Sequence, residues 1–408
     1  MLLSSLQNRV MKKSRSLPNH MPARISGTNE SVLTIILLRL PVKSLIIFRR
    51  VSKQWSSLIS DPYFCHSHTI YSIKKNPSFL SPSGFFIYNS LYNQFLSFSL
   101  SRKRSKPSLP SLSFLGQNCK ILQSCSGLLL CRLNCGTFCV CNPTTGKFKI
   151  LPSAKVDGEF SWISPFTLAF DPSRSPNYRV VCFKRIKKES PEPTGSYYFL
   201  IFIYLSEMDI WKSSNTFEVN MCPDMAAGIF SNGVVHWACH EQYIRFDMNE
   251  EKVMLMRLPF VYVFNNEHSW EIGCLWQWHD TIYSAMKSEE NFSLHELDQA
   301  TLKWIPHKYY LASYSLAKIA YRAVTKEGTE AHKYDRRERK FSVIALVKGD
   351  KEKDTAVLIA IFGKVISYNF ARRKIKIILD LGLPSDIARD VCCNCLSAYQ
   401  YVQTLSSV

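Results

Sequence analysis

The chain has 408 residues, of which 46% are hydrophobic and 13% aromatic. This composition excludes a disordered protein, and the length allows about two to three domains. The 51 Lys and Arg outnumber the 32 Asp and Glu, giving a formal net charge of +19, which makes nucleic acid or an acidic surface a partner to consider. No apolar run approaches the roughly 18 residues of a membrane helix, so no membrane association is expected.

The first segment, residues 1–27, contains Arg, Lys and Ser but no acidic residue. Such a composition describes a basic disordered tail, and it also describes a mitochondrial or plastid transit peptide. We predict that residues 1–27 form a basic disordered tail. No apolar stretch of about 7 to 15 residues follows the basic residues, so a secretory signal is not expected. Residues 1–60 carry ten Lys and Arg against one acid, Glu30, and this part of the chain holds about half of the net charge.

The run from Val32 to Ile59 contains three short helical patterns and two helix stops. Pro41 ends the first pattern, the second covers residues 43–49, and Ser52 is a suitable N-cap for the third, which stops at Asp61-Pro62. The apolar stripe is too small to close a core alone, so we expect it to bind a partner. An ordinary helical subdomain packed on the rest of the chain is the alternative. The first stripe consists of Val32, Leu33, Ile36, Leu37 and Leu40.

This run resembles the F-box, most closely its plant form. The matching positions are Arg39-Leu40-Pro41-Val42-Lys43-Ser44-Leu45, Phe48-Arg49, Val51-Ser52-Lys53, Trp55 and Leu58-Ile59-Ser60-Asp61-Pro62. The resemblance implies a three-helix hook over residues 28–68 that docks on a Skp-type adaptor of a cullin-based ubiquitin ligase. The family usually opens its first helix with Leu-Pro, whereas Thr28 and Asn29 stand here and can cap a helix but cannot fill an apolar pocket. The implied adaptor-facing or hook-forming residues are Val32, Leu33, Ile36, Leu37, Leu40, Pro41, Val42, Leu45, Phe48, Val51 and Trp55.

From about residue 79 the pattern changes to short alternating strands joined by tight polar turns. Loosely repeated units of about 40 to 50 residues with four strands each are typical of a β-propeller with a kelch-like period. A pair of β-sandwiches uses similar strands and turns and is the alternative. We therefore predict an α+β multidomain protein, with the helical F-box followed by an all-β, propeller-like domain over residues 79–400. The predicted turns begin at Asn89, Asn142, Ser206, Asp247, Asp298 and Asn369.

The β region resembles the F-box-associated domain of the same plant family. The resemblance implies that the domain recruits a substrate protein. It is carried by Ser126-Gly127-Leu128-Leu129-Leu130, Asn142-Pro143-Thr144-Thr145-Gly146-Lys147, Ala169-Phe170-Asp171-Pro172, Tyr178-Arg179-Val180-Val181, Asn232-Gly233-Val234-Val235-His236-Trp237 and Phe246-Asp247.

The Cys, His and basic clusters are the candidates for metal and nucleic-acid sites. The 14 cysteines include no paired C-x-x-C units, so we predict buried reduced thiols. His236 and His240 stand four residues apart in a predicted strand, about 13 Å, which is too far for one zinc ion. The basic clusters at 102–106 and 336–340 indicate solvated loops or, less favoured, a nuclear-import or nucleic-acid patch, because no aromatic residues interleave with them.

Sequence patterns for enzyme chemistry are missing: there is no phosphate loop, no G-x-S-x-G elbow and no H-E-x-x-H. We therefore expect a non-catalytic protein without cofactor or metal. The favoured function is the substrate-recognition subunit of an SCF-type (Skp-cullin-F-box) E3 ubiquitin ligase in the cytoplasm or nucleus, binding the adaptor, through it a cullin, and an unknown target protein. A stand-alone interaction propeller that binds protein or nucleic acid without ligase assembly is the alternative.

Overall fold

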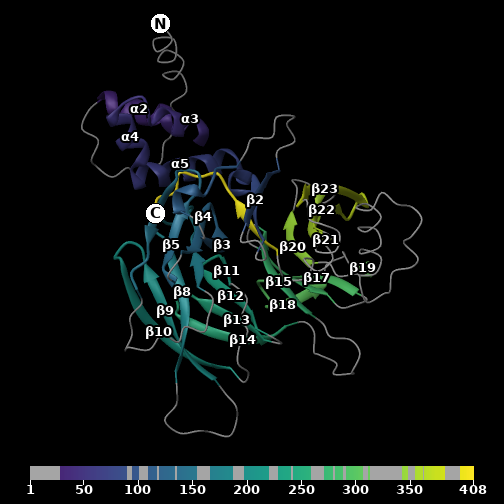
Figure 1. The fold of residues 1–408 in the computed structure, drawn as a ribbon. Helices are drawn as coiled ribbons and strands as arrows, with labels where there is room; N and C mark the ends of the chain where they lie inside the picture. Colours follow the sequence, from purple (N-terminus) through teal and green to yellow (C-terminus); the bar gives the residue numbers. More distant parts are fainter. Residues whose placement is uncertain are drawn as a thin grey trace.

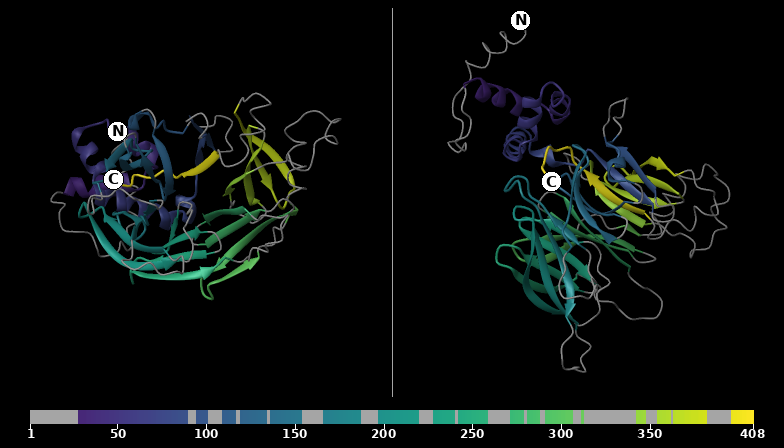
Figure 2. Two further views of the ribbon diagram at one scale, coloured as in Figure 1. Left: turned by 60° about the horizontal axis from the view of Figure 1, so that its bottom comes forward. Right: turned by 60° about the vertical axis from the view of Figure 1, so that its left-hand side comes forward.

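The computed structural model joins a small helical region to a β-propeller (Figure 1). Figure 2 shows the helices on one side of the propeller, with the C-terminal end of the chain between helices and blades. The structure describes residues 28–89, 94–100, 109–116, 119–133, 136–153, 166–186, 197–219, 228–239, 242–258, 271–278, 281–287, 291–306, 311–312, 342–347, 354–361, 363–381 and 396–408.

The short helices of the N-terminal region begin and end at the capping residues that the sequence indicated. Pro41 precedes α3 with an extended backbone, Ser52 Oγ accepts the Trp55 N–H (3.1 Å) at the start of α4, and Asp61 Oδ1 accepts the Phe64 N–H (2.9 Å). Asp61 therefore ends α4 and at the same time caps a helix that the sequence patterns did not predict, with Pro62 in its first turn. The elements are α2 (Thr28–Leu38), α3 (Val42–Phe48), α4 (Lys53–Ser60), α5 (Pro62–Lys75) and the 3₁₀ turn η2 (Pro77–Leu80).

Five blades of the propeller are each made from one continuous stretch of antiparallel chain. The first two contain β3 (Lys120–Cys125), β4 (Leu128–Arg132), β5 (Phe138–Asn142), β6 (Lys147–Ile150), and β7 (Thr167–Ala169), β8 (Arg179–Ile186), β9 (Tyr197–Leu205), β10 (Ile210–Val219). The next two contain β11 (Ile229–Ser231), β12 (Val234–Cys239), β13 (Gln242–Asp247), β14 (Lys252–Arg257), and β15 (Glu271–Trp278), β16 (Thr281–Lys287), β17 (Asn291–Asp298), β18 (Lys303–Pro306), with β19 (Leu311–Ala312) beside β17. The fifth contains β20 (Ser342–Val347), β21 (Ala356–Ile361), β22 (Lys364–Asn369) and β23 (Lys374–Asp380); a 3₁₀ turn, η3 (Ser113–Leu115), precedes β3.

The sixth blade closes the ring with strands from the two ends of the propeller sequence. β1 (Gly84–Asn89) pairs with β2 (Gln94–Ser99) on one side and with β24 (Leu396–Tyr401) on the other. β24 lies next to β3 and to β20, so the innermost strands form a continuous ring of six. This arrangement confirms the propeller prediction and rules out the pair of sandwiches for the described strands.

Five of the six predicted turns share one structure, and each connects the two outer strands of a blade. In four of them the first residue is Asn or Asp, and its side chain accepts the backbone N–H of the second or third residue after it, at 2.7–3.0 Å. The fourth residue after it has a positive φ, and a Lys then begins the last strand of the blade. The sixth predicted turn, after Asn89, connects the second and third strands of the closing blade, and residues 90–93 lie outside the described part. The four acceptors are Asn142, Asp247, Asp298 and Asn369, and the positive-φ residues are Gly146, Glu251, Leu302 and Arg373.

The cysteines of the first blades are packed as core residues. Four of them lie in one apolar cluster with Phe86 and Ile121, and each is almost fully buried. Among the residues that the structure describes, no group of three His, Cys, Asp or Glu side chains is placed to hold a metal ion. The structure thus agrees with thiols that act as small hydrophobic side chains. They are Cys119, Cys131, Cys139 and Cys141.

No helix in the described part of the chain is long and apolar enough to cross a membrane.

Candidate functional site

The helical region divides the predicted docking residues into a buried and an exposed group. Leu37, Val42 and Leu45 are buried and form a core with Ile59 and Phe64. Burial of several large aliphatic side chains supplies the free energy that keeps these short helices together, at about 25 cal/mol per Å² of apolar surface. These three residues therefore hold the helices together and cannot themselves contact a partner.

The exposed group forms the candidate docking surface, which we define as Val32, Pro41, Ile47 and Val51. Val51 is 61% exposed and Val32 is 40% exposed. Ile47 is 65% exposed, and the spacing analysis missed it. A signal was present, since the run from Leu45 to Phe48 is apolar on every face of a seven-residue helix, and one side of it must face outwards. Large apolar side chains exposed within one small helical region indicate an interaction surface.

Five predicted residues are half-buried, and all of them except Ile36 pack against the helical core. The Phe48 and Trp55 rings contact each other edge to face, with centroids 5.5 Å apart, and this contact joins α3 to α4. A partner could cover the remaining exposed faces of these side chains without disturbing the core. They are Leu33, Ile36, Leu40, Phe48 and Trp55.

His68 of α5 fixes the turn that carries Pro41. Its Nε2 donates to the Leu40 carbonyl oxygen at 2.8 Å, and its ring lies between Phe64 and Phe79. Burial lowers the pKa of His68, against the hydrogen bond to Leu40, which raises it. A neutral imidazole that donates one hydrogen bond therefore satisfies the Leu40 carbonyl, which lies in the turn between α2 and α3.

The docking surface is basic as well as apolar. Arg39, Lys43, Arg50 and Lys53 are exposed and lie near its residues in the sequence, and no acidic residue occurs from Ser31 to Ser60. Exposed cations in the same region as exposed apolar side chains favour a partner with an apolar groove and acidic edges, because opposite charges speed the encounter and exclude wrong partners.

The C-terminal segment, residues 402–408, connects the helices to the propeller. Leu405 is buried in the helical core beside Phe64, while Asn142 Nδ2 donates to the Thr404 and Ser406 carbonyl oxygens at 3.2 and 2.8 Å. The segment also passes so close to Gly127 that a Cβ there would lie 2.5 Å from Thr404 Oγ1. No pattern in the sequence pointed to this role, because the contacts join residues more than 250 positions apart.

Thr28 and Asn29, which stand where the F-box family usually has Leu-Pro, lie in the first turn of α2. Their side chains are outside the described part of the chain, as are residues 1–27 and the basic clusters at 102–106 and 336–340. The effect of the departure on adaptor affinity stays a prediction.

A helical docking region held against a closed six-bladed propeller defines the class of two-part proteins that join an F-box to a β-propeller. Residues 16–67 match the F-box domain, and residues 84–333 match the F-box associated beta propeller domain. The second match covers more than half of the chain, and the chain belongs to this family. The F-box and its associated domain, identified by resemblance from the sequence, are thereby confirmed.

Relatives with the same arrangement occur in Arabidopsis thaliana. F-box protein At5g07610 is 29% identical over 420 aligned positions, which cover 95% of this chain and 94% of that protein. F-box protein At5g49610 is 29% identical over 221 positions, covering 51% and 57%. Among solved structures, a chain of a nidogen–laminin complex matches with a TM-score of 0.42 at 9% identity, covering 79% of this chain and 99% of that chain. F-box proteins are in general non-catalytic adaptors that bind a Skp-type partner, and an F-box with a propeller is in general the arrangement of an SCF substrate receptor.

Proposed function

We propose that this protein is the substrate-recognition subunit of an SCF-type E3 ubiquitin ligase. In this proposal the docking surface binds a Skp-type adaptor, and through it a cullin, in the cytoplasm or nucleus. The observation that carries the proposal is the group of exposed apolar residues, Val32, Ile47 and Val51, in the same helical region whose buried side chains form a core. Exposed apolar anchors on short helices and the turns between them are what a partner with a hydrophobic groove requires.

The proposed mechanism is proximity and needs no catalytic residue in this chain. The helical region holds the adaptor while the propeller holds a target, so the target is kept at high effective concentration near the ubiquitin-carrying enzyme. Contacts of Leu405 with the helical core support this mechanism, because they fix the direction in which the propeller presents its target.

The test is co-purification of the full chain with a recombinant Skp-type adaptor. Ile47→Asp with Val51→Asp places two charges in the docking surface without touching the core, and we expect it to reduce adaptor binding by about 100-fold. Ile305→Asp, an exposed isoleucine on β18, is the matched control and should bind as the wild type does. Leu37→Asp is a poorer choice, because Leu37 is fully buried and a charge there would unfold the helices.

If the folded wild type retains no adaptor, the ligase proposal fails and the stand-alone interaction propeller becomes the better account. If the double variant retains as much adaptor as Ile305→Asp does, binding uses another surface and the assigned docking residues are wrong.

A further inference from the structure

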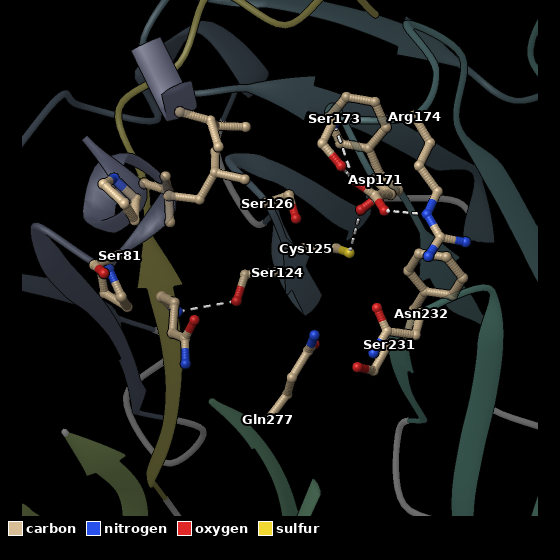
Figure 3. Close-up of a pocket in the computed structure, with 18 residues that line it drawn as sticks. Ser81, Ser124, Cys125, Ser126, Asp171, Ser173, Arg174, Ser231, Asn232 and Gln277 are labelled. Atoms are coloured by element: carbon tan, nitrogen blue, oxygen red, sulfur yellow. Dashed lines mark hydrogen bonds and ion pairs between the residues drawn. The ribbon is translucent and has the colours of Figure 1, made fainter. Parts of the chain in front are cut away.

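A cavity of about 400 Å³ lies at the centre of the propeller face that carries the helices (Figure 3). Five of the six innermost strands contribute to it at or just beyond their carboxyl ends, as Ser124 of β3, Asp171 after β7, Ser231 of β11, Gln277 of β15 and Gln400 of β24 illustrate. The size is within the usual range for ligand pockets, about 300 to 1,000 Å³.

The propeller side of the cavity is lined by several hydroxyl and amide groups, together with the side chains of Cys125, Phe170 and Phe230. Ser126 and Asn232 reach it from two tight turns, Ser126-Gly127 and Asn232-Gly233, whose residues all have positive φ as two-residue hairpin turns require. Ser231 is 2% exposed, and its Oγ has no hydrogen-bond partner among the described residues. A buried hydroxyl without a partner costs about 1–3 kcal/mol, and a ligand that supplied the missing bond would recover this free energy.

Electrostatically the cavity is neutral although the chain is strongly basic. Its charged lining residues, Asp171 and Arg174, pair with each other, with Arg174 Nε 3.2 Å from Asp171 Oδ2. Asp171 also accepts the Ser173 N–H at 2.9 Å and the Ser173 hydroxyl at 2.5 Å, so its carboxylate is already satisfied. A charged ligand would have to compete with these bonds or lose its own hydration without compensation.

The opposite wall is apolar except for Ser81 and belongs to the segment that leads to the docking helices. Ile73 of α5, Pro77 and Leu80 of η2, and Pro82 line this side. A ligand in the cavity would therefore contact the propeller with polar groups and the helical region with an apolar face.

We propose that this cavity takes an uncharged segment of the target protein, with hydroxyl or carboxamide side chains on one face and an aliphatic side chain on the other. The inference rests on the proposed function in one respect, which is that the occupant belongs to a protein target. The segment would lie between the propeller and the helices that dock on the adaptor.

The experiment uses the purified full chain and three pools of fluorescent seven-residue peptides. One pool combines Ser, Thr, Asn, Gln and Leu, one adds Asp and phosphoserine, and one adds Lys and Arg. Binding is measured by fluorescence anisotropy. We expect the neutral pool to bind at least about 10-fold more tightly than either charged pool, since the cavity offers no unpaired charge.

Filling the cavity should abolish that preference. Gln400→Trp places a large side chain in the cavity from β24, where an aromatic residue suits a strand, and Leu80→Trp fills it from the other wall. Ser97→Trp, exposed on β2 of the same blade, is the matched control. Thermal melting of each variant shows whether it is folded, and having two filling positions keeps the test decisive if one of them unfolds.

A charge variant gives an independent prediction. Arg174→Gln leaves Asp171 without its cation, so the preference should shift from the neutral towards the basic pool.

The inference is overturned if the wild type prefers a charged pool, if it binds no pool, or if folded Gln400→Trp and Leu80→Trp bind as Ser97→Trp does. Adaptor retention is measured in the same preparations. Retained adaptor without peptide preference rejects the cavity inference alone, whereas neutral-peptide binding without adaptor rejects the ligase proposal alone.

Discussion

At the scale of single residues, His236 shows how burial determines the protonation of a side chain. It lies in β12 with 1% exposure; its Nδ1 contacts the Tyr243 hydroxyl, and its Nε2 has no partner among the described residues. The pKa of His236 is lowered to about 3, mainly because burial removes the imidazole from water and, to a smaller extent, because the positive charge of Arg245 lies near it. The sequence pattern excluded a zinc site on His236 and His240 by distance, and His240 lies outside the described residues.

The low pKa of His236 predicts acid sensitivity of the propeller. In the unfolded chain this histidine titrates near 6.5, so stability is complete above about pH 7 and falls as the pH drops below 6.5, because only the unfolded chain takes up the proton. His236→Gln should reduce the loss of unfolding free energy between about pH 7.5 and pH 5.5 by about 1 kcal/mol. Urea unfolding of the propeller at both pH values measures this. An unchanged pH dependence in the variant would show that His236 is not the group responsible.

The division of the docking residues could not be predicted from their spacing. Leu37 and Val32 lie in the same apolar stripe of α2, yet one is fully buried and the other is 40% exposed. The difference arises from Phe64 of α5 and Leu405, which cover one side of the stripe. Neither residue is among the positions by which the sequence resembles the F-box, which end at Pro62, so the sequence could identify the set but not separate its members.

At the scale of secondary-structure elements, the outer turns combine a predictable and an unpredictable feature. The Asn and Asp acceptors mark the start of each turn in the sequence, because their side chains bond the backbone just ahead. The left-handed residue that ends the turn is Gly146 in one blade but Leu302 and Arg373 in others, with φ of 54° and 50°. Side chains other than Gly, Asn and Asp are unfavourable in this conformation, by about 1 kcal/mol.

Arg373→Gly should therefore stabilise the fifth blade. Arg373 is exposed, so little packing is lost, and relief of the left-handed strain should raise the unfolding free energy by about 0.5–1 kcal/mol. Ala371→Gly, in the same turn but without a positive φ, is the matched control and should lower stability, because it only adds freedom to the unfolded chain. Thermal melting of the two variants should give shifts of opposite sign. Shifts of the same sign would contradict the strain argument.

At the scale of the whole molecule, the sequence predicted the order of the parts but not how they close. Alternating strands and polar turns were sufficient for a propeller, since both are local signals. The number of blades was not predictable, because β24 pairs with β1 across more than 300 residues and nothing local marks that register. The same holds for the cavity, whose lining residues, such as Ser124, Ser231 and Gln400, meet only once the ring is closed.

The C-terminal segment is the contact whose removal should separate the two parts of the molecule. Leu405 is 2% exposed in the helical core, and residues 404 and 406 on either side of it are bonded to Asn142 of the propeller. A charge at position 405 would be buried without a partner, at a cost of several kcal/mol, so the segment should leave its site. We therefore expect Leu405→Asp to release the helices from the propeller while the propeller itself stays folded.

Release exposes the connection after α5 to proteases and lets the helical region move relative to the blades. Limited proteolysis should cut Leu405→Asp in residues 76–83 at least about 10-fold faster than the wild type, and small-angle X-ray scattering should show a larger radius of gyration. Leu405→Met, which conserves volume and apolar character, is the control and should behave as the wild type. Equal cleavage of all three proteins would mean that η2 and the strand contacts of β1 hold the helices in place without the C-terminal segment. If the prediction holds, Leu405 couples adaptor docking to the direction in which the propeller presents its target.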